Sequence, residues 1–220
     1  GGELGFISAS FDYDIGGMQI PLMAHTAATY ILDAANNHLP GYAGLTQGAA
    51  ELIIHFASKD LLETFVPNML SGKWGGTMCL TEPQAGSSLS DIVTKAKPTQ
   101  NGYYNITGQK IFISGGDNQF AENIVHLVLA RVEGAAKGTK GISLFIVPKN
   151  RNKSDGTLES NDVTTVADFQ KMGQKGYCTT HLGFGDKDDC KGWLVGEENQ
   201  GLNYMFLMMN AARIAVGRGS

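Results

Sequence analysis

The sequence predicts an α+β fold in which helices come first, strands follow and one more helix closes the chain. Between about residues 20 and 71 the apolar residues recur at helical spacing. From about 75 to 197 the period drops to two and turn signals recur at short intervals, which indicates seven or so strands in a sandwich or barrel. A helical pattern returns near 198 without partner helices, so we expect the chain to be a fragment.

Three helices are expected in the first part of the chain. Their sequences are PLMAHTAATYILDAANNHL (21–39), YAGLTQGAAELIIHFAS (42–58) and KDLLETFVPNMLSG (59–72). Gly72 is typical of a helix end. Pro67 predicts a kink or a break, because proline removes a backbone donor from the helix.

The strands are read from alternating polarity and from turn residues. An Asn-Gly turn at 101–102 precedes the longest of them, which runs from Tyr103 to Ser114. In 91–99 the alternation predicts Ile92, Thr94 and Ala96 on the buried face. The remaining strands are expected at 75–82, 123–132, 140–149, 163–173 and 179–186. The polar stretch 150–162 gives no reason to pack and is expected to be a surface excursion.

Composition excludes several functional classes. The net charge is −4 and the pI about 5.7, so no basic field attracts nucleic acid or anionic lipid. No apolar run approaches the roughly 20 residues that span a bilayer, and no secretory signal opens the chain. Three scattered cysteines and five scattered histidines give no metal-ligand spacing. We therefore expect no nucleic acid, membrane span or metal, and a reducing, cytoplasmic compartment.

The last helical pattern lies in ENQGLNYMFLMMNAARIAV (198–216). Its apolar face is broad and must pack on something. With partner helices missing, we expect Met205, Phe206 and Met209 to be exposed and to favour non-native association. Residues 218–220 are typical of a remnant left by cloning.

The stretch MCLTEPQAGSSLSD (78–91) is the strongest candidate for a binding motif. An apolar strand ends there in an acid-proline break, a glycine and several serines. One interpretation is an ordinary loop. The other is a loop that holds a phosphorylated or heteroaromatic ligand, because backbone N–H groups and hydroxyls at a strand end point outward.

Three motifs, taken in order, resemble the acyl-CoA dehydrogenase family. They are MCLTEPQAGSS (78–88), GQKIFISGG (108–116) and GEENQGLNYMFLMMNAARIAVG (196–217). The resemblance runs from about Gly5 to Gly217, nearly the whole chain. The stretches AENIVHLVLARVEGAAKGTKGISLFIVPK (121–149) and LGFGD…GWLVGEENQGL are similar to the branch that contains methylmercaptopropionyl-CoA dehydrogenase.

The resemblance implies three domains. Residues 1–73 would be the end of an N-terminal helical domain, 74–197 a middle antiparallel β-barrel domain, and 198–220 the first helix of a truncated C-terminal helical bundle. It also implies FAD, wedged between barrel and bundle, and oxidation of an acyl-CoA to the trans-2-enoyl-CoA. Electron-transfer flavoprotein would be the electron acceptor, and the full-length protein a homodimer or homotetramer.

The resemblance also assigns binding residues. FAD contacts fall on Met78, Leu80, Thr81, Gly86, Ser87, Phe112, Ile113 and Ser114. Acyl-CoA contacts fall on Ser87 and Arg213. No catalytic residue is assigned, because the family's glutamate base lies in the C-terminal bundle and nothing here corresponds to it. The chain itself is therefore expected to be inactive.

At several positions this sequence departs from the family pattern. Ser88 stands in place of an aspartate, Phe112 in place of a tryptophan, Ser114 in place of a threonine, and Asn210 in place of an acidic residue. These departures leave two alternatives open. The fold is shared by acyl-CoA oxidases and flavin monooxygenases, and a barrel that has lost the chemistry would be a non-catalytic flavin, CoA or protein-binding module.

Overall fold

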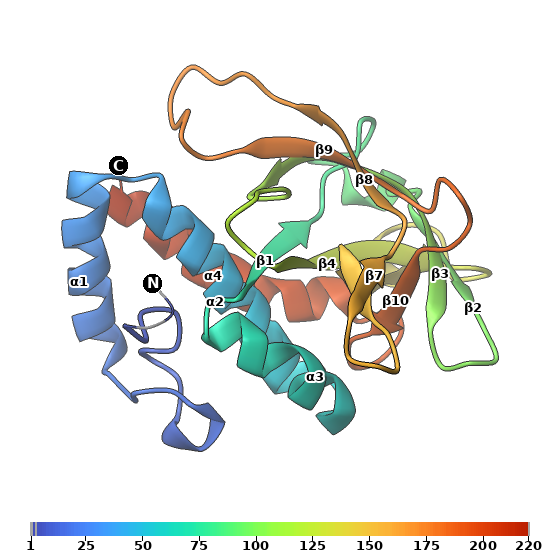
Figure 1. Cartoon of the computed structure of the whole chain (residues 1–220). Helices are drawn as coiled ribbons and strands as arrows, with labels where there is room; N and C mark the ends of the chain where they lie inside the picture. The colour runs from blue at the N-terminus through green and yellow to red at the C-terminus, as the bar shows by residue number, and fades with distance from the viewer. Residues whose placement is uncertain (1, 3, 220) are drawn as a thin grey trace.

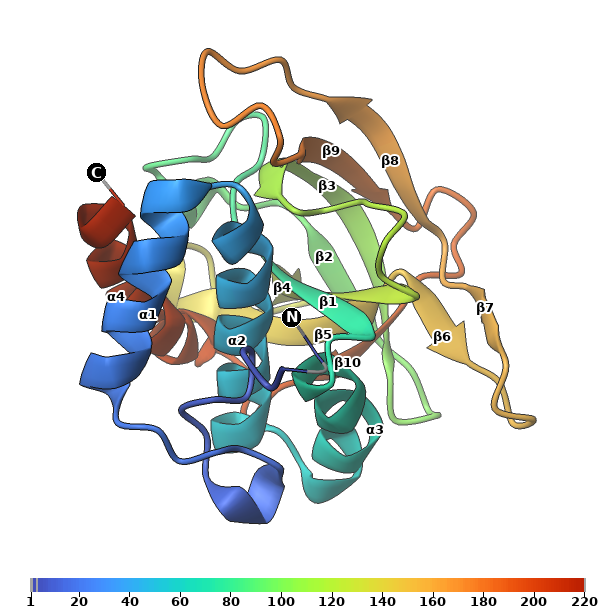
Figure 2. The ribbon, with the colours of Figure 1, turned by 60° about the vertical axis from the view of Figure 1, so that its left-hand side comes forward.

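The computed structural model describes residues 2 and 4–219. Helices pack on one side of a β-barrel, and the N-terminal and C-terminal helices lie side by side (Figures 1 and 2). A short 3₁₀ turn, η1 (Tyr13–Ile15), precedes the helices α1 (Leu22–Ala35), α2 (Leu39–Phe56) and α3 (Lys59–Leu70), and α4 (Gly201–Gly219) follows the strands. The order of helices, strands and helix predicted from periodicity is confirmed.

Five strands close the barrel. They pair in the order β2–β4–β5–β10–β3 and return to β2, which contacts both β3 and β4. These strands are β2 (Lys95–Pro98), β3 (Tyr104–Ser114), β4 (Asn123–Val132), β5 (Ile142–Pro148) and β10 (Lys191–Leu194). Outside the ring, β1 (Trp74–Cys79) pairs with β4, and β9 (Thr179–Phe184) and β8 (Val163–Asp168) extend the sheet beyond β3. The barrel is antiparallel except where β4 runs parallel to β1 and β2.

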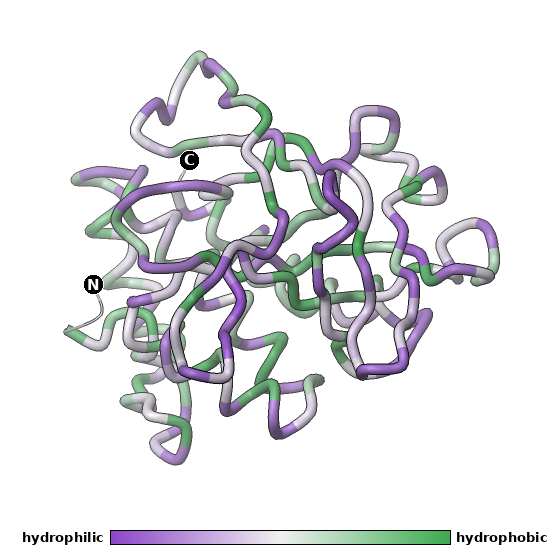
Figure 3. Tube along the Cα trace, turned by 45° about the vertical axis from the view of Figure 1, so that its right-hand side comes forward, coloured by the Kyte–Doolittle hydropathy of each residue, from purple (hydrophilic) through white to green (hydrophobic). Residues whose placement is uncertain are grey.

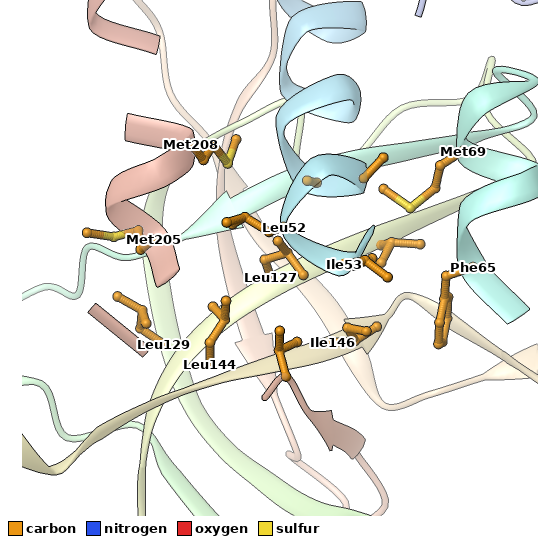
Figure 4. Close-up of a cluster of buried hydrophobic side chains, with 14 of the residues drawn as sticks. Leu52, Ile53, Phe65, Met69, Leu127, Leu129, Leu144, Ile146, Met205 and Met208 are labelled. Atoms are coloured by element: carbon orange, nitrogen blue, oxygen red, sulfur yellow. The ribbon is translucent and has the colours of Figure 1, made fainter. Parts of the chain in front are cut away.

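The central strands β4 and β5 are buried on both faces, which explains why their sequences are mostly apolar. On β4, Leu127 and Leu129 face the helices, whereas Val128 and Ala130 face the barrel interior. Figure 4 shows the helix-facing side chains converging from α2, α3, α4 and the sheet. In Figure 3 the projecting loops are mostly hydrophilic and the barrel strands are more hydrophobic.

Two expectations about the helices need correction. Of the kink or break expected at Pro67, the break does not occur: helix α3 continues to Leu70, because Met69 and Leu70 are buried and hold the last turn in place. Met205 is not exposed either: it is 2% accessible and packs in the helix-facing core, while Phe206 remains 44% exposed. In the described part of the chain, helix α4 packs on α1, α2 and β5.

The stretch 150–162 is largely a surface excursion, as expected, because residues 152–157 are exposed, although Asn161 and Asp162 are buried. It forms the hairpin β6 (Asn150–Asn152) and β7 (Leu158–Ser160), which projects from the side of the barrel away from α1 (Figure 2). Arg151 anchors the hairpin by ion pairs to Glu159 at 2.7 Å and Asp189 at 2.6 Å. The predicted alternation in 91–99 is confirmed, although only Lys95–Pro98 joins the ladder.

Helix α1 shows an apolar surface to solvent. Its buried residues are His25 and Thr29, whereas large apolar side chains are exposed, namely Leu22, Met23, Tyr30, Ile31 and Leu32. An ion pair of 2.8 Å between Arg218 and Asp33 ties the end of α4 to this helix. In the described part of the chain, no helix is both long and apolar enough to cross a membrane.

The barrel interior contains a neutral histidine. His126 is fully buried, and its Nδ1 lies 2.8 Å from Thr77 Oγ1. Burial lowers the pKa of His126 from 6.5 to about 3. The unfolded chain therefore takes up a proton between these values that the folded chain does not, so stability falls as the pH drops through this window.

Replacing His126 by glutamine is expected to remove this pH dependence. Lowering the pH from 7 to 5 should cost the unmodified protein about 2 kcal/mol more than His126→Gln, because glutamine keeps polar atoms near Thr77 but does not titrate. Urea unfolding of both proteins at the two pH values measures this difference. Equal pH dependence would mean that His126 is protonated in the folded protein.

Candidate functional site

The end of β1 presents a free strand edge. In the described part of the chain β1 is the terminal strand of its sheet, with β4 on one side only. On the other side, the Gly76 N–H donates to Thr46 Oγ1 of α2 at 3.0 Å. Backbone groups of alternate residues point to the same edge, so those of Met78 also point away from β4. The predicted site residues Met78 and Leu80 are both half-buried along this edge.

A tight turn follows the strand. Glu82 N–H donates to the Ala85 carbonyl at 2.9 Å, and Ala85 N–H donates back to the Glu82 carbonyl at 3.0 Å. Pro83 and Gln84 occupy the two central positions, so the acid-proline break predicted from the sequence is a two-residue turn.

A buried ion pair connects this turn to β3. Lys110 Nζ lies 2.8 Å from Glu82 Oε1, and the two side chains are 0% and 1% exposed. The same ammonium donates to the Leu80 carbonyl at 3.0 Å. Glu82 also accepts from Val93 N–H at 2.8 Å and Thr94 N–H at 3.1 Å, so one carboxylate joins both ends of segment 82–94.

The electrostatics of the pair follow from its burial. Burial by itself would raise the pKa of Glu82, but the charge and hydrogen bond of Lys110, with the backbone donors, hold it below its ordinary value. Burial lowers the pKa of Lys110, and Glu82 partly offsets this effect. We therefore treat the pair as a carboxylate and an ammonium.

A β-bulge places Phe112 at the surface. The register between β3 and β9 shifts between Lys110 and Ile113, and Ile111 N–H donates to the Thr81 carbonyl at 2.9 Å. Phe112 has φ of 58°, in the left-handed region that non-glycine residues seldom adopt, and its side chain is 56% exposed. Its ring lies 4.6 Å from that of Phe169. Such strain is concentrated at functional sites.

A pair of variants tests this conformation. In an ordinary strand glycine is less stable than alanine by roughly 0.5–1 kcal/mol. At Phe112 the order should reverse, with Phe112→Gly more stable than Phe112→Ala by about 1 kcal/mol, because alanine is strained at positive φ. Both variants lose the ring, so the comparison isolates the backbone. Denaturant unfolding that finds alanine the more stable would contradict the bulge.

The other two residues of this motif differ in burial. Ile113 is 2% exposed and its side chain belongs to the barrel interior, because the bulge returns it to the face of Ile106 and Lys110. Ser114 is half-buried and pairs with Thr179 of β9. Only the backbone of Ile113 is thus available on the Phe112 side of the strand.

The serine-rich loop is exposed and internally hydrogen-bonded. Gly86 and Ser87 face solvent, and a Cβ on Gly86 would meet only Thr81 Cγ2, at 3.8 Å. Ser88, in place of the aspartate, lies 3.1 Å from the Ser90 hydroxyl, which donates to Asp91 Oδ1 at 3.2 Å. A carboxylate therefore lies in this loop three residues after the expected position.

Arg213 is separate from this group of residues. It is exposed on α4, and its guanidinium donates to Asn210 Oδ1 at 2.8 Å, one turn earlier on the same helix. The main packing partners of α4 are α1, α2 and β5. The structure thus brings Thr81 together with Gly86 and the Lys110–Phe112 segment, but does not bring Arg213 to them.

Three residues of this region were missed in the sequence. Lys110 and Glu82 lie inside the quoted motifs, but a lysine in an alternating strand predicts exposure, and nothing local indicates a partner 28 residues away. Phe169 had no signal beyond its place before the polar stretch QKMG. The only available indication for Lys110 was that the alternation of the strand gives this charged residue an inward position.

Comparison with known proteins identifies the family. Residues 77–187 match the family model described as the acyl-CoA dehydrogenase middle domain. A butyryl-CoA dehydrogenase of Syntrophomonas wolfei is 43% identical over 90% of this chain and 34% of its own length. The 3-methylmercaptopropionyl-CoA dehydrogenase of Ruegeria pomeroyi is 41% identical over 98% of this chain and 36% of its own.

A solved structure has the same fold. The acyl-CoA dehydrogenase of Bacillus anthracis, complexed with FAD, superposes with a TM-score of 0.81 and 25% identity over 99% of this chain and 35% of its own. This chain spans about a third of the length of these two curated relatives. Because a family model covers half of its length, and its motifs and barrel agree with that match, the chain belongs to the acyl-CoA dehydrogenase family.

Proposed function

We propose that the chain carries part of the FAD and acyl-CoA site of an enzyme that converts an acyl-CoA thioester to the trans-2-enoyl-CoA. The observation that carries this proposal is the convergence of the unpaired edge of β1 at Met78, the turn held by the Lys110–Glu82 ion pair, and the strained bulge at Phe112. A flavin requires hydrogen bonds along its ring edge and a packed face. The edge of β1 and the exposed ring of Phe112 fit these two requirements.

Each predicted residue takes a distinct role in this proposal. The backbones of Met78 and Leu80 and the hydroxyl of Thr81 bind the flavin edge, Leu80 through its N–H because its carbonyl already accepts from Lys110, and Phe112 covers one face. Ser114 contributes a hydroxyl and Ile113 its backbone. Gly86 supports the proposal because no protein atom crowds its Cβ position, so the space above it is open for a ligand to approach closely.

The acyl-CoA is expected beside the same turn. Ser87 is exposed next to Gly86 and is proposed to contact FAD and the thioester, whereas Arg213 is proposed to contact the CoA arm. When bound, FAD would accept the hydride that leaves the β-carbon. No residue here is proposed as the base, so the 220-residue chain by itself is expected not to turn over acyl-CoA.

Further parts of the proposal rest on the family resemblance. Electron-transfer flavoprotein would accept the electrons, and the enzyme would be a homodimer or homotetramer in the cytoplasm. The exposed apolar side chains of α1 support a further packing partner on that face. The domain boundaries 1–73, 74–197 and 198–220 remain predictions.

An FAD titration tests the proposal. Saturable binding by the gene product that contains this chain is expected, with bleaching of the flavin band when an acyl-CoA is added without oxygen. Flavin binding with oxygen consumption in place of reduction of electron-transfer flavoprotein would favour an oxidase or a monooxygenase.

The non-catalytic alternative rests on Ser88, Phe112 and Asn210, which depart from the family pattern. Absence of flavin binding would reject the dehydrogenase and favour this binding module. Flavin binding without bleaching by any acyl-CoA would also favour it.

A further inference from the structure

The buried pair of Lys110 and Glu82 is placed to control geometry around Thr81 and Phe112. Thr81 lies between Leu80 and Glu82, and both neighbours bind the Lys110 ammonium, at 3.0 and 2.8 Å. Thr81 is itself tied to β3 through the 2.9 Å bond from Ile111 N–H. The residue at the strand end therefore has restraints on both sides and on its own carbonyl.

The same pair supports the bulge. Lys110 is the last residue of β3 in the original register with β9, and Phe112 follows two positions later with φ of 58°. A left-handed phenylalanine persists only when its surroundings fix the chain on both sides. Before Phe112, the chain is fixed by Lys110, which is bonded to the turn. After Phe112, it is fixed by Ile113 and Ser114, which pair with β9 again.

Stability alone does not explain why a charged pair occupies this place. A well-packed apolar pair is often as stable as a buried ion pair, because the charges lose their hydration. The ion pair instead makes directional hydrogen bonds that fix the position of the turn. Glu82 accepts from Gln84, Val93 and Thr94 as well as from Lys110. Apolar side chains would leave the turn and β3 without these fixed distances.

We propose that Lys110 and Glu82 are positioning residues, which hold Thr81 and Phe112 in the relative placement that binds flavin. This inference rests on the proposed function. Neither side chain is exposed, so each acts through the residues it holds and not by touching the cofactor.

The test compares three variants of the gene product that contains this chain. Lys110→Met removes the ammonium, and the double variant Lys110→Met with Glu82→Gln also removes the carboxylate charge that would be left unpaired. Arg151→Met is the matched control, because Arg151 is a mostly buried cation whose partners are Glu159 and Asp189. Thermal midpoint, FAD dissociation constant and the shape of the visible flavin spectrum are measured, with binding at a temperature where circular dichroism shows every variant folded.

If the pair has a positioning role, thermal stability and FAD affinity should change independently among the variants. The double variant should recover thermal stability relative to Lys110→Met yet bind FAD about tenfold or more weakly than the unmodified protein, with a changed flavin spectrum. Arg151→Met should lose stability and keep its FAD affinity within about twofold.

The opposite pattern overturns the inference. If the double variant bound FAD with unchanged affinity and spectrum, or if Arg151→Met weakened FAD as much, the pair would be structural only. In either case the unmodified protein would still bind FAD, and the proposed function would stand. Failure of the unmodified protein to bind FAD would reject the proposed function and the positioning role together.

Discussion

Replacing Lys110 by methionine is expected to lower the free energy of unfolding by about 3–5 kcal/mol, the cost of breaking a buried ion pair from one side. Methionine fills a similar volume, so little of this loss comes from a cavity. The loss comes from Glu82, whose carboxylate stays buried at 2% exposure without its cation. Leu80 loses a donor to its carbonyl at the same time. Urea unfolding followed by circular dichroism measures the difference.

Lys59→Met is the matched control. It makes the same substitution and also breaks an ion pair, to Glu63 at 3.6 Å, but the two side chains are 85% and 62% exposed. An exposed pair of this kind contributes less than about 0.5 kcal/mol. Similar losses in the free energy of unfolding in both variants would mean that burial does not determine how much the pair at Lys110 contributes to stability.

The pH dependence of Lys110→Met provides a second readout. Removing the cation takes away the main interaction that depresses the pKa of Glu82, so burial should raise that pKa. In the unmodified protein the depressed pKa contributes stability above the ordinary pKa of Glu82, and this is lost as the pH falls through the folded value. In the variant, acidification should instead relieve part of the destabilisation, since protonation neutralises the unpaired carboxylate.

Local patterns predicted most of the elements because burial on one or two faces determines the spacing of apolar residues in the sequence. The double-sided burial of β4 and β5 appears as mostly apolar runs, interrupted by His126 in β4 and Ser143 in β5, and the Asn-Gly turn before β3 appears as a dipeptide. Closure of the barrel leaves no such trace. It depends on β2 pairing in parallel with β4, and only two residues of β2, Lys95 and Ala96, enter that ladder.

The sequence indicated which residues form the candidate site, but not how they are arranged in space. Motif resemblance selected Thr81, Gly86 and Phe112, which the structure places around one turn and one bulge. Alternation cannot find the bulge, because an extra residue shifts the face of every side chain that follows. Nor can it find the Lys110–Glu82 pair, since a buried charge is energetically acceptable only with a partner that the fold supplies.

Replacing Gly201 by alanine is expected to displace the start of α4 and to lower the free energy of unfolding by about 3 kcal/mol, the upper part of the range for overpacking. A Cβ at this position would lie 2.5 Å from the Ser143 carbonyl carbon and 2.7 Å from the Leu144 nitrogen. These are backbone atoms of β5, a central strand that cannot yield, so the helix must move. The shift would also weaken the 2.8 Å bond from Asn199 N–H to the Ser143 hydroxyl.

Movement of α4 should be detectable directly, because Met205 and Met208 of this helix are only 2% and 4% exposed in the core. Limited proteolysis of Gly201→Ala should therefore cleave within 201–219 at protease concentrations that leave the unmodified chain intact. Gly217→Ala is the control on the same helix, since no atom lies within 4 Å of its Cβ position. That variant should be unchanged or up to about 1 kcal/mol more stable, because alanine is the better helix former. Equal protection of α4 in Gly201→Ala and in the control would show that the close contact between α4 and β5 does not hold the helix in place.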